Sequence, residues 1–267
     1  MPEGDTIARA AIRLGRALTG TTLVRAEIRR RSASPPPGVQ VTEVEAIGKH
    51  LMIRFDNGRT LHTHMQMSGT WDVHRAGDRW RRPGHQARVI LGTDDGWEAV
   101  CFNAPVVEYI ATVAEVDKVG HLGPDLTRAG VDLDAAVRRF DLLDPATELG
   151  VALLDQRVAC GVGNVYKSDV SFIERINPFT SVGSLDGATR MALLATASRL
   201  LQANLTTPRR ITFHGGLAVY HRAGRPCRRC ATIVQARPQG EEARMTYWCP
   251  TCQPAPLTSG SATSGTT

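Results

Sequence analysis

The sequence of 267 residues lacks any run of about 18 consecutive apolar residues, although 42% of its residues are hydrophobic. A transmembrane helix needs a run of that length, so the sequence predicts no membrane span. The N-terminus also lacks the basic stretch and apolar core of a secretory signal, because Glu3 and Asp5 come first. We therefore expect a cytoplasmic protein that buries a core of its own and has no membrane partner.

Lysine is absent between Arg199 and Arg244, where the chain has nine arginines and where Glu241 and Glu242 are the only acidic residues. The whole chain carries a net charge of +6 and has a pI of about 9.3. A basic balance favours an anionic partner, either a nucleic acid or an acidic membrane surface. Arginine forks match phosphate oxygens, so this region is a candidate for holding a nucleic-acid backbone. A solvated basic surface is the alternative.

The first part of the chain reads as an antiparallel β domain behind one leading helix. Apolar residues recur at helical spacing from Ile7 to Leu18, and Asp5 or Thr6 can cap the start of that helix. Later segments alternate between apolar and polar residues, with turn signals at 56–58 and 94–96.

Helical periodicity replaces this alternation after residue 130, and an arginine- and glycine-rich stretch follows Pro208. The sequence thus predicts an α+β protein. Its segments are the β domain at 2–115, a Gly- and Pro-rich linker at 116–130, a helical domain at 131–207, a loop with a cysteine hairpin at 208–253, and a disordered tail at 254–267.

Four of the six cysteines form two CxxC pairs, Cys227 with Cys230 and Cys249 with Cys252. This spacing is typical of a structural zinc site, in which four thiolates fill the tetrahedral coordination and leave no open position. A pair of disulfides is the alternative, and a cytosolic chain disfavours it. The other two cysteines, Cys101 and Cys160, read as buried thiols.

Two short motifs are each weak alone. The turn at 161–164 (GVGN) places Gly163 and Asn164 at a helix start, where free backbone N–H groups can bind phosphate. The alternative is that these four residues form an ordinary turn at the start of a helix, with no phosphate site. Likewise, Pro2 and Glu3 in MPEGDT can simply open the first helix.

Taken together, the motifs resemble the bacterial Fpg/Nei DNA glycosylases over residues 2–253. The resemblance is carried by MPEG at the start, GKHL at 48–51, HLGPDL at 121–126, LLDQ…GVGNVY at 153–166, and the hairpin ending in RMTYWCPTCQ. It implies an N-terminal β-sandwich, a helix–two-turn–helix domain and a zinc-finger hairpin. It also implies a nucleoid-associated bacterial monomer that acts on damaged double-stranded DNA, with single-stranded DNA left open.

The resemblance also assigns roles. Family members remove an oxidised base and then cut the strand through a Schiff base on the N-terminal proline, here Pro2 once Met1 is removed. Glu3 matches the general acid and base, whereas Lys49 and Arg244 match residues that touch phosphate and support catalysis. For DNA binding, Gly163 and Asn164 match the backbone clamp, and Met67, with Gln66 beside it, matches the wedge that fills the gap left by the flipped base. Without the family, Met67 reads as a core methionine.

Departures from the family pattern favour the endonuclease VIII branch, which acts on oxidised pyrimidines. The segment at 101–110 lacks the Arg-Phe pair of the purine-directed branch, and the loop from Asn204 to Tyr220 is short. Thr6 stands where the family usually has a glutamate, and Ser68 where some members have a tyrosine. A purine-directed glycosylase and a non-catalytic zinc-finger DNA-binding protein remain the alternatives.

Overall fold

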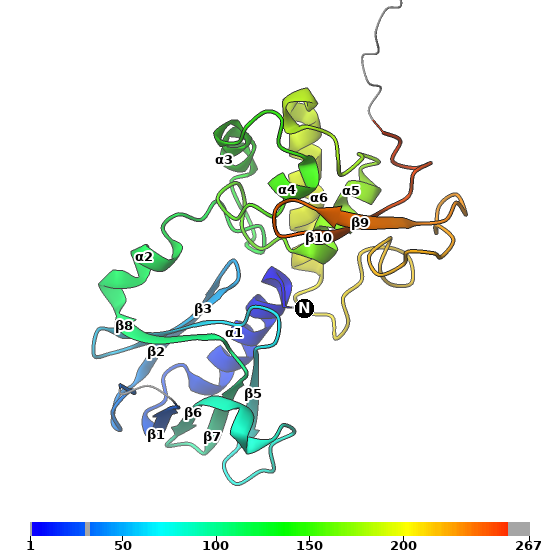
Figure 1. Ribbon diagram of the computed structural model, residues 1–267. Coiled ribbons are helices and arrows are strands. Elements are labelled where there is room, and N and C mark those ends of the chain that lie inside the picture. The colour runs from blue at the N-terminus through cyan, green and yellow to red at the C-terminus, as the bar shows by residue number, and fades with distance from the viewer. Residues whose placement is uncertain (1, 30–32, 256–267) are drawn as a thin grey trace, which may run out of the picture.

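The computed structural model describes residues 2–29 and 33–255. The chain forms two lobes, one built on β-sheets and one on helices, with the N-terminus between them (Figure 1). The predicted α+β architecture is confirmed. The boundaries proposed for its segments stay predictions, and residues 256–267 of the expected tail lie outside the described part.

The leading helix α1 (Gly4–Leu18) packs its apolar face on the β lobe, with Ile7, Leu14 and Leu18 buried. The prediction that Asp5 or Thr6 caps it is wrong. Glu3 holds the cap position without a side-chain cap, and Asp5 lies inside the first turn. Its carboxylate accepts hydrogen bonds from the guanidinium of Arg210, which comes from the other lobe.

Two four-stranded antiparallel sheets form the sandwich. One has the order β1-β6-β7-β5, with β1 (Leu23–Ile28), β5 (Thr70–Arg75), β6 (Ala87–Thr93) and β7 (Trp97–Phe102). The other has the order β2-β3-β4-β8, with β2 (Val41–Ile47), β3 (His50–Phe55), β4 (Arg59–His64) and β8 (Val106–Ala111). Large side chains such as Leu51, Leu61 and Trp71 are buried between the sheets and α1. The core therefore fixes the strand ends that carry the β2–β3 turn.

The second lobe packs helices around a separate apolar core that includes Tyr166, Leu193 and Leu201. Its helices are α3 (Leu133–Arg138), α4 (Leu149–Ala152), α5 (Asn164–Ile173) and α6 (Gly187–Ala203). The connection between the lobes contains the short helix α2 (Val116–Val119). Within the described ranges, no helix has both the length and the apolar character needed to cross a membrane.

A hairpin of β9 (Gln235–Gln239) and β10 (Arg244–Trp248) packs beside α5 (Figure 1). Hydrogen bonds join β10 to α5: Asn164 Nδ2 donates to the carbonyl of Met245 (2.8 Å), and Lys167 Nζ donates to Thr246 Oγ1 (2.6 Å). The start of α5 and the start of β10 are therefore held as one unit.

Candidate active site

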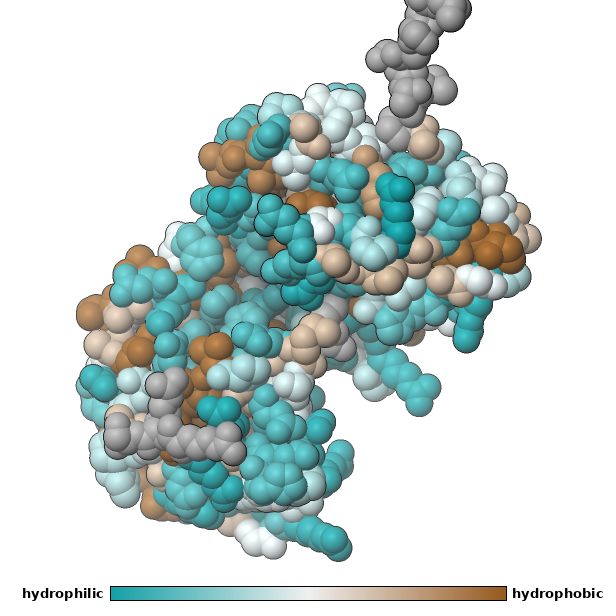
Figure 2. All heavy atoms as spheres, in the orientation of Figure 1, coloured by the Kyte–Doolittle hydropathy of each residue, from teal (hydrophilic) through white to brown (hydrophobic). Residues whose placement is uncertain are grey.

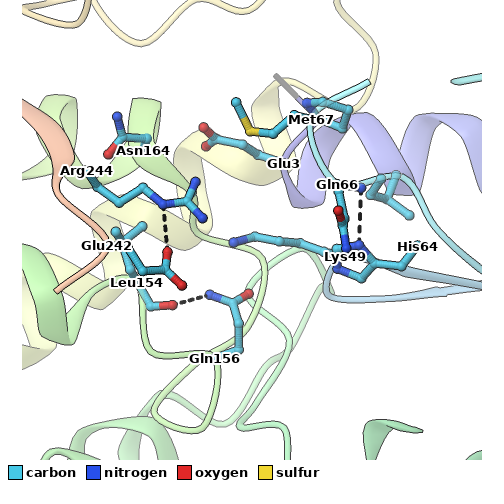
Figure 3. Close-up of a pocket in the computed structure, with 13 residues that line it drawn as sticks. Glu3, Lys49, His64, Gln66, Met67, Leu154, Gln156, Asn164, Glu242 and Arg244 are labelled. Carbon is cyan, nitrogen blue, oxygen red and sulfur yellow. Dashed lines mark hydrogen bonds and ion pairs between the residues drawn. The ribbon is translucent and has the colours of Figure 1, made fainter. Parts of the chain in front are cut away.

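A cleft of about 470 Å³ lies where the lobes meet, and the surface is hollowed between them (Figure 2). The eight residues that the sequence predicts to act on DNA all line it: Pro2, Glu3, Lys49, Gln66, Met67, Gly163, Asn164 and Arg244. They come from α1, the β2–β3 turn, the turn after β4, the start of α5 and the hairpin. The fold thus brings five separate segments to one place (Figure 3).

Glu3 is fully buried at the floor of the cleft, and the N-terminus of α5 holds its carboxylate. Oε1 accepts the backbone N–H of Val165 (2.8 Å), and Oε2 lies 3.4 Å from the N–H of Tyr166. These N–H groups have no partner inside the helix and carry its positive end, so they suit a carboxylate. Gly163 is required here, because a Cβ on it would lie 2.4 Å from Glu3 Cδ.

Burial raises the pKa of Glu3 above its usual value of 4.5. The nearby Arg210, the Val165 N–H and Lys49 oppose that shift by stabilising the charged form, but desolvation is the largest effect. A carboxyl group with a raised pKa can donate a proton near neutral pH and take it back, as a general acid and base must.

Lys49 lies in the β2–β3 turn, and its ammonium group points into the cleft (Figure 3). Gly48 gives the turn its shape, with φ of 57° and its N–H donated to Asp125 Oδ2 (2.8 Å). A Cβ on Gly48 would also lie 2.9 Å from Cys160 Sγ, so glycine is the residue that fits. Burial lowers the pKa of Lys49, and Glu3 acts in the opposite direction.

The turn after β4 projects Gln66 and Met67 from the β lobe. It closes through a hydrogen bond from the Gly69 N–H to the Met65 carbonyl (2.8 Å), and a Cβ on Gly69 would clash with that backbone. Met65 is buried, whereas 62% of Met67 is exposed. Met67 is therefore not the core methionine that its residue type alone suggests.

Arg244 and Asn164 face the cleft from the helical lobe. Arg244 Nε donates to Glu242 Oε2 (2.7 Å), an exposed pair seen in Figure 3. The Oδ1 atom of Asn164 is buried and has no hydrogen-bond partner. A buried polar atom without a partner is costly, so it marks a place where a ligand or water belongs.

Several residues at the site escaped the sequence analysis. Gln156, inside the quoted LLDQ motif, clamps the glycine turn: its Nε2 donates to the carbonyl of Val162 (3.1 Å), and its Oε1 accepts the N–H of Gly161 (3.1 Å). His64 lines the cleft beside Lys49. Arg210 pairs with Asp5 across the lobes. The LLDQ motif could have pointed to Gln156, whereas neither His64 nor Arg210 carries a local signal.

The four clustered cysteines lie in the second lobe, and their Sγ atoms are all within 4.8 Å of one another. All four are free thiols, which agrees with a metal site rather than two disulfides. The Cys227–Cys252 and Cys230–Cys249 sulfur distances are 3.9 and 3.4 Å. Thiolates around one tetrahedral zinc lie about 3.8 Å apart, so this set of donors fits such an ion.

The two lobes, the hairpin and the cleft between them define the Fpg-type fold. A solved structure of the formamidopyrimidine-DNA glycosylase of Lactococcus lactis, non-covalently bound to DNA containing an AP site, superposes with a TM-score of 0.79. That match covers 95% of this chain and all of the other at 18% identity. At that identity the match shows a shared fold.

Family models match the formamidopyrimidine-DNA glycosylase N-terminal domain at residues 1–105 and its H2TH domain at residues 122–213. A Streptomyces coelicolor protein named "Probable endonuclease 8 2" is 45% identical over 97% of both chains. The "DNA-(apurinic or apyrimidinic site) lyase Nei2" of Mycolicibacterium smegmatis is 40% identical over 96% of this chain and all of the relative. The chain therefore belongs to the formamidopyrimidine-DNA glycosylase family, as its motifs predicted.

Proposed function

We propose that this protein is a base-excision-repair DNA glycosylase and AP lyase that removes oxidised pyrimidines from double-stranded DNA. The observation that carries the proposal is the buried Glu3 carboxyl, held on the start of α5 in the same cleft as Pro2 and Lys49. A non-catalytic DNA-binding protein has no use for a buried carboxyl group beside its chain start. Relatives at 40–45% identity that are named endonuclease 8 and AP lyase support the same activity.

The reaction begins at the nitrogen of Pro2, which is a secondary amine once Met1 is removed; Met1 itself lies outside the described residues. A free α-amine titrates near about 8, and the positive end of α1, which starts two residues later, favours its neutral form. The neutral nitrogen attacks C1′ of the sugar, and the base leaves with the bonding electrons and takes up a proton. Opening of the sugar ring, after the proline nitrogen has lost its proton, then turns this adduct into an iminium ion, which acts as the electron sink for strand cleavage.

Glu3 supplies the proton that opens the sugar. In its protonated form it can donate to the ring oxygen as the C1′–O bond breaks, and it then takes a proton back. Loss of a C2′ proton expels the 3′ phosphate by β-elimination, and δ-elimination then releases the 5′ phosphate. In our proposal Lys49 contacts phosphate close to the reacting sugar, where the negative charge of the phosphate favours the ammonium form that burial alone disfavours.

The remaining lining residues hold the DNA. The nucleotide must be flipped out of the duplex, because C1′ is unreachable while the base is stacked. We propose that Met67, with Gln66 beside it, fills the space that the flipped nucleotide leaves in the duplex, since both residues project from one tight turn. We assign Gly163, Asn164 and Arg244 to the phosphates next to the lesion. Arg244 then exchanges its contact with Glu242 for a phosphate oxygen.

A structural zinc ion completes the proposal. Cys227, Cys230, Cys249 and Cys252 would hold it, and four thiolates leave the metal no open position for catalysis. When bound, it supplies cross-linking that a small hairpin cannot obtain from a core of its own. The hairpin carries Arg244, so the metal acts through the position of that side chain.

Borohydride trapping tests the activity. We expect protein whose N-terminal Pro2 is confirmed by mass spectrometry to form a covalent adduct with a duplex containing an AP site. The matched control retains one extra residue before Pro2 and forms none, because its proline nitrogen is an amide. If correctly processed protein gives no adduct, the chain only binds DNA and our proposal is wrong.

Lesion choice needs its own experiment. Duplexes containing dihydrouracil, thymine glycol or 8-oxoguanine are offered in competition under single-turnover conditions. We expect faster release of the two pyrimidine lesions. Preferential excision of 8-oxoguanine would assign the protein to the purine-directed alternative while leaving the trapping result intact.

A further inference from the structure

One arginine links two buried carboxylates at the start of α1. Asp5 and Glu3 are both fully buried. Arg210, from the segment after α6, donates from Nε to Asp5 Oδ2 (2.9 Å) and from Nη2 to Asp5 Oδ1. Its Nη2 also donates to Thr6 Oγ1 (3.0 Å), and its Nη1 lies 3.8 Å from Glu3 Oε1. This guanidinium is the shared cation of both acids.

The geometry is specific to arginine. A planar fork meets the two oxygens of Asp5 in parallel, which an ammonium group cannot do. The guanidinium also lies over the ring of Tyr166, 5.1 Å from its centroid. Tyr166 belongs to α5, the helix whose N-terminus holds Glu3. Arg210 therefore touches both helices that position the Glu3 carboxyl.

The segment that carries Arg210 is itself docked on α1. Arg9 Nη1 donates to the carbonyl of Thr207 (2.5 Å), and Asn204 Oδ1 accepts the N–H of Ile211 (2.8 Å). Both contacts hold the chain on either side of Arg210. The helical lobe thus reaches across to the first turn of the β lobe's leading helix, directly beside the chain start.

We propose that Arg210, together with Asp5, is a positioning pair that fixes the first turn of α1 so that Pro2 and Glu3 face the flipped sugar. This inference rests on the proposed function. Arg210 does not line the cleft, so it acts through Asp5 and Glu3 rather than on DNA. Without its charge, Asp5 keeps only the longer contact with Arg9 (3.5 Å), and Glu3 loses its strongest cationic partner. The two buried carboxylates then repel each other more strongly, which displaces the Glu3 carboxyl from α5.

A second consequence concerns the Glu3 proton. The charged or polar groups that face Glu3 come from five elements: Arg210, Lys49, Asp5, Tyr166, Lys167, Tyr220 and the Val165 N–H. Among those that lower the Glu3 pKa, Arg210 has the largest effect. Loss of the guanidinium therefore raises the Glu3 pKa further. The protonated, acid-donating form then persists to higher pH.

The experiment compares Arg210→Lys and Arg210→Gln with the wild type. The matched control is Arg16→Gln, because Arg16 is an exposed arginine in the last turn of α1, away from the chain start. We measure the single-turnover borohydride-trapping rate on an AP-site duplex from pH 5 to 9, the Kd for the same duplex, and thermal melting. We expect at least a tenfold loss of trapping rate and a Kd within threefold of wild type in both Arg210 variants. The high-pH limb should move to higher pH in Arg210→Gln, which removes the charge. Arg16→Gln should trap like the wild type.

Arg210→Lys keeps a positive charge but loses the planar guanidinium. It therefore tests the two-point contact with Asp5 even if Arg210→Gln fails to fold. The double variant Asp5→Asn/Arg210→Gln should trap faster than Arg210→Gln alone, since it removes the repulsion between the Asp5 and Glu3 carboxylates. The inference is overturned if folded Arg210→Lys traps at the wild-type rate with an unchanged pH profile. It is equally overturned if the rate loss is matched by the same loss of DNA affinity. Failure of the wild type to trap would instead refute the proposed function.

Discussion

Alanine at Gly163 places a methyl group where the Glu3 carboxyl lies. A Cβ there would be 2.4 Å from Glu3 Cδ and 2.7 Å from Oε1. Carbon atoms in contact settle at roughly 3.5–4.0 Å, so the carboxyl must retreat by about 1 Å. The backbone at Gly163 has φ of −127° and ψ of −163°, an extended conformation that alanine adopts freely. The perturbation is therefore steric and acts on the one carboxyl group that we propose as the acid and base.

Its size follows from the geometry that catalysis requires. A misplacement of about 1 Å can cost about 100-fold in rate, which is about 2.7 kcal/mol in the activation barrier. Overpacking a buried site also lowers the free energy of unfolding by about 1–3 kcal/mol. We expect Gly163→Ala to remain folded with a lower Tm and to cut DNA about 100-fold more slowly.

Single-turnover cleavage of an AP-site duplex measures the effect, with thermal melting recorded on the same samples. Gly187→Ala is the control, because Gly187 starts α6 and a Cβ there meets nothing within 4 Å. That variant should cut at the wild-type rate. If folded Gly163→Ala cuts within threefold of the wild type, the Glu3 carboxyl does not need the position that the structure gives it.

Three further predictions concern charge and metal. The Glu3 pKa is higher in the folded state than the usual value of 4.5 that applies in the unfolded state. Between these two pKa values the folded state holds a proton that the unfolded state has released, so the free energy of unfolding of the wild type falls as pH rises above about 4.5. Urea unfolding should therefore show Glu3→Gln gaining stability relative to wild type from about pH 4.5 upward; a constant difference would contradict this. Arg244→Ala should reduce the slope of log K against log salt by about 0.9 in DNA titrations, and an unchanged slope would remove Arg244 from the phosphate contacts. A zinc chelator, or Cys249→Ser, should weaken DNA binding by disordering the hairpin; binding that survives verified metal loss would contradict it.

Much of the site could be predicted from the sequence because its chemistry sits in short contiguous motifs. Pro2 with Glu3, Gly48 with Lys49, and Gly163 with Asn164 are each adjacent, and the glycines leave room for close approach. Such a motif keeps its meaning without knowledge of the fold. The two CxxC pairs also carry their spacing in the sequence, which is why the cysteine cluster was expected before the structure placed it.

The contacts that join the lobes could not be predicted in this way. Asp125 holds the Gly48 N–H from 77 positions away, and Arg210 reaches Asp5 over 205 positions. Either residue alone reads as an ordinary surface charge. Strands β5 and β8 were also not predicted, since each fully buries only one of its six residues. The helix expected around 147–155 shrinks to α4, where Gly150 lies against the Gln239 side chain.

Three histidines beside Lys49 give a last prediction, about their protons. His62 Nδ1 lies 2.9 Å from Glu108 Oε2, so it carries the proton and donates. Its Nε2 is then an acceptor for His50 Nδ1–H, which lies 2.9 Å away. His64 differs, since its Nδ1 accepts the N–H of Gln66 (3.1 Å) and the proton must sit on Nε2.

Burial, with the charge of Lys49, lowers the pKa of His64 to about 4, so the ring stays neutral across physiological pH. It then offers the cleft a single N–H donor and no titrating charge. Nitrogen-15 NMR of the free protein should report His64 protonated on Nε2, and His50 and His62 on Nδ1, from pH 6 to 8. A His64 that titrates near 6.5, or that carries its proton on Nδ1, would contradict the network. DNA binding would then gain affinity on acidification through that group, whereas a neutral His64 contributes no proton-linked change in binding between pH 6 and 8.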